Sequence, residues 1–319
     1  MWIYHFIIAL SLGILTISGT ILVFNSTALS QDALSENAIL SAIRKSKVSD
    51  SLADDLAGLI RNSILMKTAV CPEDTIPVGS SKIGGLPDLP SGWDWPAWNG
   101  QPLSFICQIN FEELAPYDTE KVLPTHGILY FFYDAKQSVW GFDPQDRGGW
   151  RVLFTENKTG LERTSLPSTL PEEGQFYPCK VDFSSQLTLP PPESELFSEP
   201  LSKRDWEAYY DLLESLGLLS ESSGVHRVLG HPDQMQGDML LECQLAFHGL
   251  YVGDSSGYND PRAQQLRSGA KDWRLLVQID SDDQSGMMWG DVGRLYFWIR
   301  EEDLRNRQFD NVWLILQCS

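Results

Sequence analysis

The chain repeats a short series of motifs, in the same order, in its two halves. In chain order, the repeated pairs are GLPD at 85–88 with GHPD at 230–233, FICQIN at 105–110 with LLVQID at 275–280, GILYFFYD at 127–134 with GRLYFWIR at 293–300, and WRVLF at 150–154 with WLILQ at 313–317. Four matches in one order are difficult to obtain by chance, and they are typical of a supersecondary unit that occurs twice. We therefore predict an internal duplication, with similar units at about 76–156 and 225–319.

The repeated motifs also predict the type of fold. Most are short apolar runs bounded by Gly, Pro and Asp, which is typical of β-strands joined by turns. Apolar residues at helical spacings over 32–67 predict two amphipathic helices, interrupted at KVSD, 47–50. Ser202 followed by Asp205 predicts the start of a further helix, and Gly217 predicts its end. These patterns predict an internally duplicated chain that contains both strands and helices.

These patterns divide the chain into three parts. Residues 1–30 form an apolar N-terminal segment, 31–69 a helical lead-in, and 70–319 one duplicated domain. The two units of this domain are joined by a proline-rich acidic connector and a helix over 189–217. The second unit holds an insertion, YNDPRAQQLRSG at 258–269, whose proline predicts the start of a helix.

The N-terminal segment is long enough to cross a membrane. Residues 2–24 contain no acidic or basic side chain apart from His5. A helix of this length spans roughly 30 Å, the thickness of a bilayer core. We predict a single-pass membrane anchor with the body in the cytoplasm, because the nearest Lys and Arg residues follow the segment. The alternatives are a signal peptide cleaved near Ala28 and Ser30, with an exported body, and an unusual extension of a cytoplasmic protein.

Charge and cysteine usage exclude some partners. The chain has 43 acidic and 24 basic residues, so its net charge of -19 repels phosphate backbones. Nucleic acid is therefore not an expected partner. The five cysteines are odd in number and include no C-x-x-C pair, which argues against a disulfide framework and a zinc site. We predict no cofactor and no resident metal.

From about Lys82 to its C-terminus, the chain resembles the YwqG-like proteins, a bacterial domain of unknown function. The segments that carry the resemblance are GGLPDLPSGWDWP, FICQINFEEL, GILYFFYD, HRVLGHPDQMQGDM, DWRLLVQIDSD, WGDVGRLYFWIREEDL and VWLILQCS. The resemblance implies a compact α+β domain, largely of antiparallel strands with helices outside, that is generally cytosolic. It implies no catalytic residues, and the family needs no apolar segment such as 2–24.

One segment fits a catalytic pattern. GDSSG at 253–257 matches the G-x-S-x-G nucleophile elbow. An α/β-hydrolase needs a histidine downstream of that serine, whereas the last histidine of this chain is His248. We interpret the segment as a loop that leads into the inserted helix.

Another segment has the outline of a calcium loop. DSDDQSGMMWGD at 280–291 has acidic residues at suitable spacings, but its sixth position is Ser285, where the turn requires glycine. The twelfth position is Asp291, which lacks the bidentate reach of Glu. We interpret the segment as an acidic hairpin loop, with calcium binding as the alternative. The remaining candidate metal ligands lack the close spacing of a ligand pair: His226, His231, His248 and Glu242.

The segment SGWDWP, 91–96, has no counterpart in the second half. In an extended segment Trp93 and Trp95 point to the same side, and with Trp98 they would form an aromatic platform for a sugar, a base or a proline-containing peptide. The alternative is that these rings cover the open end of a sheet.

The second Gly-x-Pro-Asp corner carries polar groups that the first lacks. His231 stands where the first corner has Leu86, and Gln236 follows it. We predict that these two residues line a ligand groove between the two units, together with Trp289 and Asp291. One aromatic wall, one titratable ring and a few polar groups suit a small polar or sugar-like molecule.

Together these features favour a non-enzymatic binding or interaction module, tethered to the membrane, whose partner is a small polar ligand or a protein. The alternative hypothesis is a hydrolase-like or metal-assisted enzyme that uses the Asp280–Asp291 loop with His231. We prefer the binding module because no nucleophile, base and orienting group occur together in a supporting motif.

Overall fold

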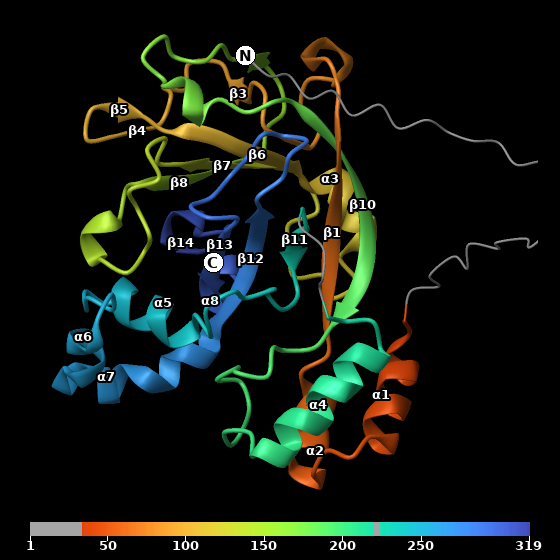
Figure 1. The fold of residues 1–319 in the computed structure, drawn as a ribbon. Helices are drawn as coiled ribbons and strands as arrows, with labels where there is room; N and C mark the ends of the chain where they lie inside the picture. Colours follow the sequence, from red (N-terminus) through yellow and green to blue (C-terminus); the bar gives the residue numbers. More distant parts are fainter. Residues whose placement is uncertain (1–33, 220–223) are drawn as a thin grey trace, which may run out of the picture. The chain divides into compact units, whose positions relative to one another are not determined.

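The computed structural model describes residues 34–219 and 224–319, which belong to one compact unit (Figure 1). The predicted N-terminal anchor, 2–24, lies outside the described residues. Within the described residues, no helix is long and apolar enough to cross a membrane.

A ten-stranded antiparallel sheet is the main element of the fold, and its strand order is β14-β13-β12-β11-β1-β10-β2-β6-β7-β8. Its strands are β1 (Arg61–Val70), β2 (Lys82–Ile83), β6 (Ser104–Asn110), β7 (Ile128–Tyr133), β8 (Trp150–Thr155), β10 (Cys179–Thr188), β11 (His226–Leu229), β12 (Trp273–Asp280), β13 (Arg294–Arg300) and β14 (Trp313–Gln317). Two small sheets pair β3 (Asp88–Pro90) with β9 (Leu161–Arg163) and β4 (Ala97–Trp98) with β5 (Gln101–Pro102). The predicted antiparallel sheet is confirmed.

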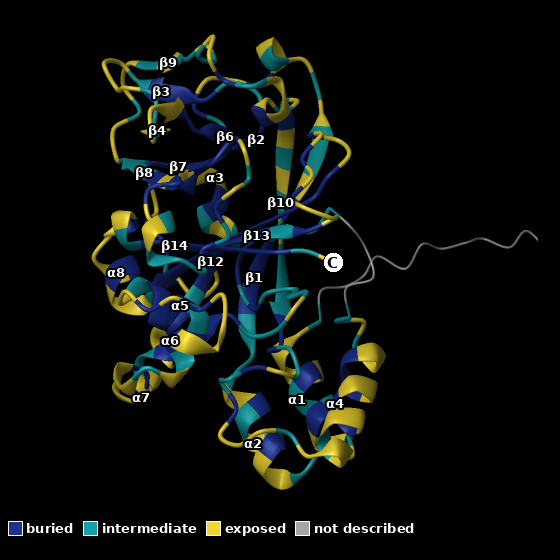
Figure 2. Ribbon diagram, turned by 60° about the vertical axis from the view of Figure 1, so that its left-hand side comes forward, coloured by how far each residue is buried: buried dark blue, intermediate teal, exposed yellow. Residues whose placement is uncertain are grey.

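The helices within the described residues are α1 (Glu36–Lys45), α2 (Asp50–Gly58), α3 (Phe111–Leu114), α4 (Lys203–Ser215), α5 (Leu240–Phe247), α6 (Ser255–Asn259), α7 (Pro261–Leu266) and α8 (Glu301–Arg305). The break between α1 and α2 is where the sequence predicts it, because the Ser49 hydroxyl caps α2. The Ser202 hydroxyl likewise accepts the backbone N–H of Asp205 and caps α4. Not every helix is external, since six of the eight residues of α5 are buried (Figure 2).

The predicted helical lead-in 31–69 is wrong beyond residue 60. Residues 61–70 form β1, which pairs with β10 on one side and with β11 on the other. Ile64 and Met66 are buried while the residue between them is partly exposed, and this alternation fits a strand. The helical spacing was a coincidence of short apolar runs. A strand in this position pairs its backbone groups on both sides, which no helix could do there.

The strands on the two sides of β1 and β10 follow the same order. From the centre outwards they are β2, β6, β7 and β8 on one side and β11, β12, β13 and β14 on the other. Gln108 of β6 faces Tyr130, and Gln278 of β12 faces Tyr296. Both β6 and β12 also carry a β-bulge just before this glutamine.

Each of these glutamines holds a Gly-x-Pro-Asp corner. Gln108 accepts the backbone N–H of Asp88 at 2.8 Å and donates to the carboxylate of that aspartate at 2.8 Å. Gln278 makes the same two bonds to Asp233, at 2.9 and 3.0 Å. The second corner needs glycine at Gly230, because its φ is +74° and a Cβ atom there would lie 2.5 Å from a serine side chain of β1.

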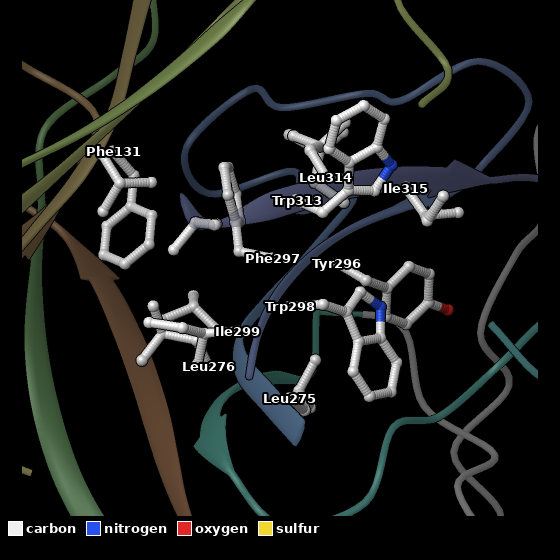
Figure 3. Close-up of a cluster of buried hydrophobic side chains, with 14 of the residues drawn as sticks. Phe131, Leu275, Leu276, Tyr296, Phe297, Trp298, Ile299, Trp313, Leu314 and Ile315 are labelled. Carbon is white, nitrogen blue, oxygen red and sulfur yellow. The ribbon is translucent and has the colours of Figure 1, made fainter. Parts of the chain in front are cut away.

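The main core lies between the two sets of strands. Phe131 of β7 and Phe297 of β13 meet edge to face with their ring centroids 4.9 Å apart (Figure 3). Trp150 and Trp313 meet in the same way at 4.8 Å. Because these residues are 163 or more positions apart in the chain, neither set of strands completes this core alone.

A separate apolar cluster packs α1, α2 and α4 together. Its buried residues are Ile39, Ile43, Leu52, Leu56, Leu189, Phe197, Tyr209, Leu212 and Leu213. A hydrogen bond of 2.8 Å from the backbone N–H of Ser49 to the Asp205 carboxylate joins the starts of α2 and α4. The outward faces of these three helices are exposed (Figure 2).

Candidate functional site

A cavity of about 430 Å³ lies between α4, the connector 189–193 and the second Gly-x-Pro-Asp corner. Elements far apart in the chain meet here, since β1, β10 and β11 also contribute to its wall (Figure 1). The lining residues with polar or aromatic side chains include Trp206, Tyr210, Arg227, His231, Asp233 and Arg294. Its volume is within the range of small-molecule sites.

Helix α4 supplies the aromatic wall. Trp206, Tyr210 and Leu213 are spaced by four and three residues, so they lie on one face of the helix. The neighbouring Tyr209 instead points into the helical cluster, and its hydroxyl donates to the carbonyl of Pro190 at 2.6 Å. This bond holds the proline run of the connector against α4. Trp206 and Tyr210 remain 37% and 50% exposed.

Two arginines lie at the other wall. Arg227 of β11 is only 4% exposed, and its guanidinium is ion-paired with Asp233. Its Nε atom is buried and has no hydrogen-bond partner among the described residues. Arg294 is ion-paired with Asp280 at 2.9 Å and donates to the backbone carbonyl of Asp233 at 2.7 Å. A buried donor without a partner costs free energy, and because this Nε atom is itself buried, a ligand in the cavity does not reach it.

His231 is held as a neutral ring. Burial lowers its pKa to about 4, and the positive charges of Arg61 and Arg227 act in the same direction. Its Nε2 lies 2.7 Å from the backbone carbonyl of Leu59. A carbonyl only accepts, so Nε2 carries the proton and Nδ1 is left as an acceptor. Its backbone N–H donates to the Thr188 hydroxyl at 3.0 Å.

The structure does not bring the four predicted groove residues together. His231 lines the cavity, whereas Trp289, Gln236 and Asp291 do not. Trp289 is 1% exposed and packs edge to face on two rings of the main core, while its Nε1 donates to the carbonyl of Asp280 at 3.2 Å. The prediction that Trp289 forms a groove wall is therefore wrong, because a ring buried this completely offers no face to a ligand.

Gln236 and Asp291 are exposed near the C-terminal end of the chain. The backbone N–H of Gln236 donates to the Gln317 side chain at 3.0 Å, and the carbonyl of Asp291 accepts from the backbone N–H of Ser319 at 3.1 Å. Both contacts use backbone atoms. The two residues thus secure the end of β14 rather than the cavity.

Trp93 and Trp95 also lie outside the cavity wall. Trp93 packs on Tyr130 with ring centroids 6.0 Å apart, and Trp95 packs on Phe132 at 5.5 Å. The indole N–H of Trp95 donates to the carbonyl of Leu103 at 2.9 Å. These contacts favour the alternative interpretation, in which the two rings cover a small apolar cluster at the sheet.

The acidic loop after β12 has protein partners for its first carboxylates. Asp280 is paired with Arg294, and Asp282 accepts from the Thr68 hydroxyl at 3.0 Å and contacts His226 Nε2 at 3.3 Å. Across the part of the chain that the structure describes, no group of three His, Cys, Asp or Glu side chains is placed to hold a metal ion. The GDSSG segment is only in part the predicted loop, because Ser255 to Gly257 already belong to α6, whose first turn the Asp254 side chain caps.

Sequence reasoning missed the principal residues of the cavity. Helix α4 carries Trp206 and Tyr210 as well as Tyr209, and these three aromatic residues were a signal that the helix has two apolar faces. Arg227 occupies the strand position that Lys82 occupies in the first half, since each faces a glutamine of the next strand. Its partnerless Nε could be recognised only in the folded chain.

The sequence was also compared with known proteins. The family model described as Domain of unknown function (DUF1963) matches residues 81–318. A search of curated proteins found no match. The matched region contains both sets of outer strands, both corners and the arginines of the cavity. Because the match covers well over half of its length, this chain belongs to the family Domain of unknown function (DUF1963).

Proposed function

We propose that this protein is a non-enzymatic binding module whose site is the cavity of about 430 Å³ between α4 and the second corner. The observation that carries the proposal is the wall of this cavity, where the half-exposed rings of Trp206 and Tyr210 lie with the side chains of His231 and Arg294. Aromatic faces together with a few polar groups are the usual lining of a small-molecule site.

This wall supports a small polar ligand with one apolar face. Trp206 and Tyr210 are half-exposed rings that suit stacking against a sugar or another ring. His231 Nδ1 is a hydrogen-bond acceptor, so it would accept a hydrogen bond from a hydroxyl group of the same ligand. The preferred ligand therefore carries a ring face and hydroxyl groups, as sugars and nucleosides do.

The test is a thermal-shift screen of monosaccharides, nucleosides and amino acids with the full chain. We expect at least one class to raise the melting temperature, and the double variant Trp206→Ala, Tyr210→Ala to lose that increase. Both rings are partly exposed, so each substitution should cost less than the roughly 3–5 kcal/mol of a fully buried aromatic residue.

Tyr251→Ala is the matched control, because Tyr251 is 45% exposed and lies outside the cavity wall. It should keep the full ligand-induced shift. A ligand whose effect survives in the double variant would bind elsewhere, and that result would refute the assignment of the cavity.

We also propose that the domain, 70–319, is internally duplicated and is YwqG-like, with units at about 76–156 and 225–319. The matching strand orders, bulges and corner hydrogen bonds support the duplication. The fourth pair of motifs, WRVLF and WLILQ, matches in the structure only when one motif is shifted by one residue. Leu153 lies opposite Tyr130, and Ile315 lies opposite Tyr296, although Leu153 and Ile315 are not aligned in the sequence match.

The apolar composition of residues 2–24 supports a further proposal, that the module is tethered to the membrane with its body in the cytoplasm. This proposal rests on the sequence alone. It is independent of the cavity, so the two proposals succeed or fail separately.

A further inference from the structure

Basic side chains gather where the C-terminal end of α1 meets the N-terminal end of α4. The residues of this basic patch are all exposed, and they are Arg44, Lys45, Lys47, Lys203 and Arg204. The Arg204 guanidinium donates to the backbone carbonyl of Lys47 at 3.5 Å, so segments 157 positions apart in the chain form one surface. Helices α1 and α4 lie side by side with their outward faces exposed (Figure 2).

These cations are largely unpaired. Within the described residues, Lys203 alone of the five has an ion pair, and its Nζ atom lies 3.9 Å from a Glu207 oxygen. An ion pair between two exposed side chains is weak, because water screens it and both chains lose freedom. The positive charges of the patch therefore remain available to a partner.

Three acidic residues share this surface: Asp50, Asp205 and Glu207. The Asp205 carboxylate is engaged by the fold, since it accepts from the backbone N–H of Ser49 and from the Ser202 hydroxyl, both at 2.8 Å. Asp50 lies in the first turn of α2, where its charge favours the helix dipole. Five cations and three carboxylates leave the patch positive, in a chain whose net charge is -19.

The net charge of the whole chain does not decide what this patch attracts. At an ionic strength of about 0.1 M, exposed charges more than roughly 10 Å apart are largely screened from one another. A large anionic partner that touches the patch responds mainly to the charges of the patch itself. An anionic surface can therefore bind here although most of the molecule would repel it.

The place of the patch in the chain indicates a membrane as that surface. The apolar segment 2–24 ends twelve positions before α1 begins at Glu36. Twelve extended residues span at most roughly 40 Å, so a tether at 2–24 would hold the body close to the bilayer. Each Lys or Arg near an anionic bilayer strengthens binding by about fivefold.

We propose that the basic patch is a docking surface for an anionic lipid bilayer, whose headgroups it contacts with its Lys and Arg side chains. The proposal builds on the proposed tether, because a tethered body meets the bilayer at a high effective concentration. It does not depend on the ligand cavity. The patch by itself should bind weakly, since only two positive charges are in excess.

The experiment is co-sedimentation of the chain without residues 1–30 with lipid vesicles. This variant keeps the whole compact unit that holds the patch and the apolar cores. We expect binding at least about fivefold tighter to vesicles with about 30% phosphatidylserine than to vesicles of phosphatidylcholine alone. The difference should disappear in about 1 M salt, where charges are screened within roughly 3 Å.

The double variant Arg44→Gln, Lys45→Gln should bind the phosphatidylserine vesicles about tenfold or more weakly, because it removes two cations of the patch. Glutamine is a good helix former, so α1 should persist. The matched control is Lys136→Gln, Arg151→Gln, which removes the same charges at exposed positions outside the patch. The control should bind these vesicles like the parent variant.

Thermal melts establish that each variant is folded. If the α1 double variant does not fold, Lys203→Gln, Arg204→Gln at the start of α4 gives the same test. Equal binding to the two kinds of vesicle, equal losses in the patch and control variants, or binding of an RNA homopolymer but not of vesicles would each overturn the proposal. The tether is tested separately on the full chain by membrane extraction, so either proposal can fail while the other stands.

Discussion

At the scale of single residues, burial separates side chains that look alike in the sequence. Trp289 and Trp206 each lie within two residues of an aspartate, but Trp289 is 1% exposed in the main core and Trp206 is 37% exposed at the cavity. The position of Trp289 in an acidic loop gave it the character of a surface residue. Its ring nevertheless packs on Tyr133 and Phe176, which come from elsewhere in the sequence.

Trp289→Ala should therefore destabilise the protein by about 3–5 kcal/mol, as truncation of a large buried aromatic does. Urea unfolding at neutral pH measures the change. Trp93→Ala is the comparison, since that ring is 36% exposed and should cost clearly less. Equal, small losses for both variants would contradict the core assignment of Trp289.

At the scale of elements, the Gly-x-Pro-Asp corner is the unit that the two halves share most closely. In each corner a buried glutamine from the neighbouring strand satisfies the backbone N–H and the carboxylate of the aspartate. The same glutamine also donates to a backbone carbonyl just before the strand of the corner, that of Ser80 or Val225. Each corner is thus held by side-chain bonds that reach across the sheet.

Gln108→Leu and Gln278→Leu should each lower the unfolding free energy by about 1–3 kcal/mol, because leucine fills a similar volume but leaves the aspartate N–H and a carbonyl unpaired. Similar losses in the two variants would agree with a duplicated structural role. Gln145→Leu, at an exposed position, serves as the control and should be near neutral. A loss at one corner alone would argue against equivalent corners.

At the scale of the whole described unit, β1 joins the two sets of strands. It pairs with β10 over ten positions and with β11 over four, so the sheet is continuous from β14 to β8. The faces of the two sets then meet through Phe131 and Phe297. One shared core makes this domain a single cooperative body.

The tether is tested by carbonate extraction of membranes from cells that express the full chain. We expect the full chain to stay in the pellet, because a spanning apolar segment resists extraction, and a variant without residues 1–30 to move to the supernatant. A full-length chain in the supernatant would exclude a spanning anchor. A shortened N-terminus, read by mass spectrometry, would support cleavage instead.

Local patterns in the sequence determined the outer strands of the two sets, the corners and the cap of α4. Turn residues fix backbone conformation within a few positions, so Gly230 and Ser202 could be interpreted without their neighbours in space. These features depend on the chain's own periodicity and on short-range hydrogen bonds. The resemblance to the YwqG-like proteins implied the antiparallel character of the sheet.

Only the tertiary structure decided where the side chains lie and what they contact. His231 meets Leu59, 172 positions away, and α4 meets the corner after β11 to enclose the cavity. Residues 61–70 form a strand because their backbone groups pair with both β10 and β11. Burial, ion pairing and cavities arise from contacts between segments that are distant in the chain. A local sequence pattern does not specify which distant segment a residue will contact.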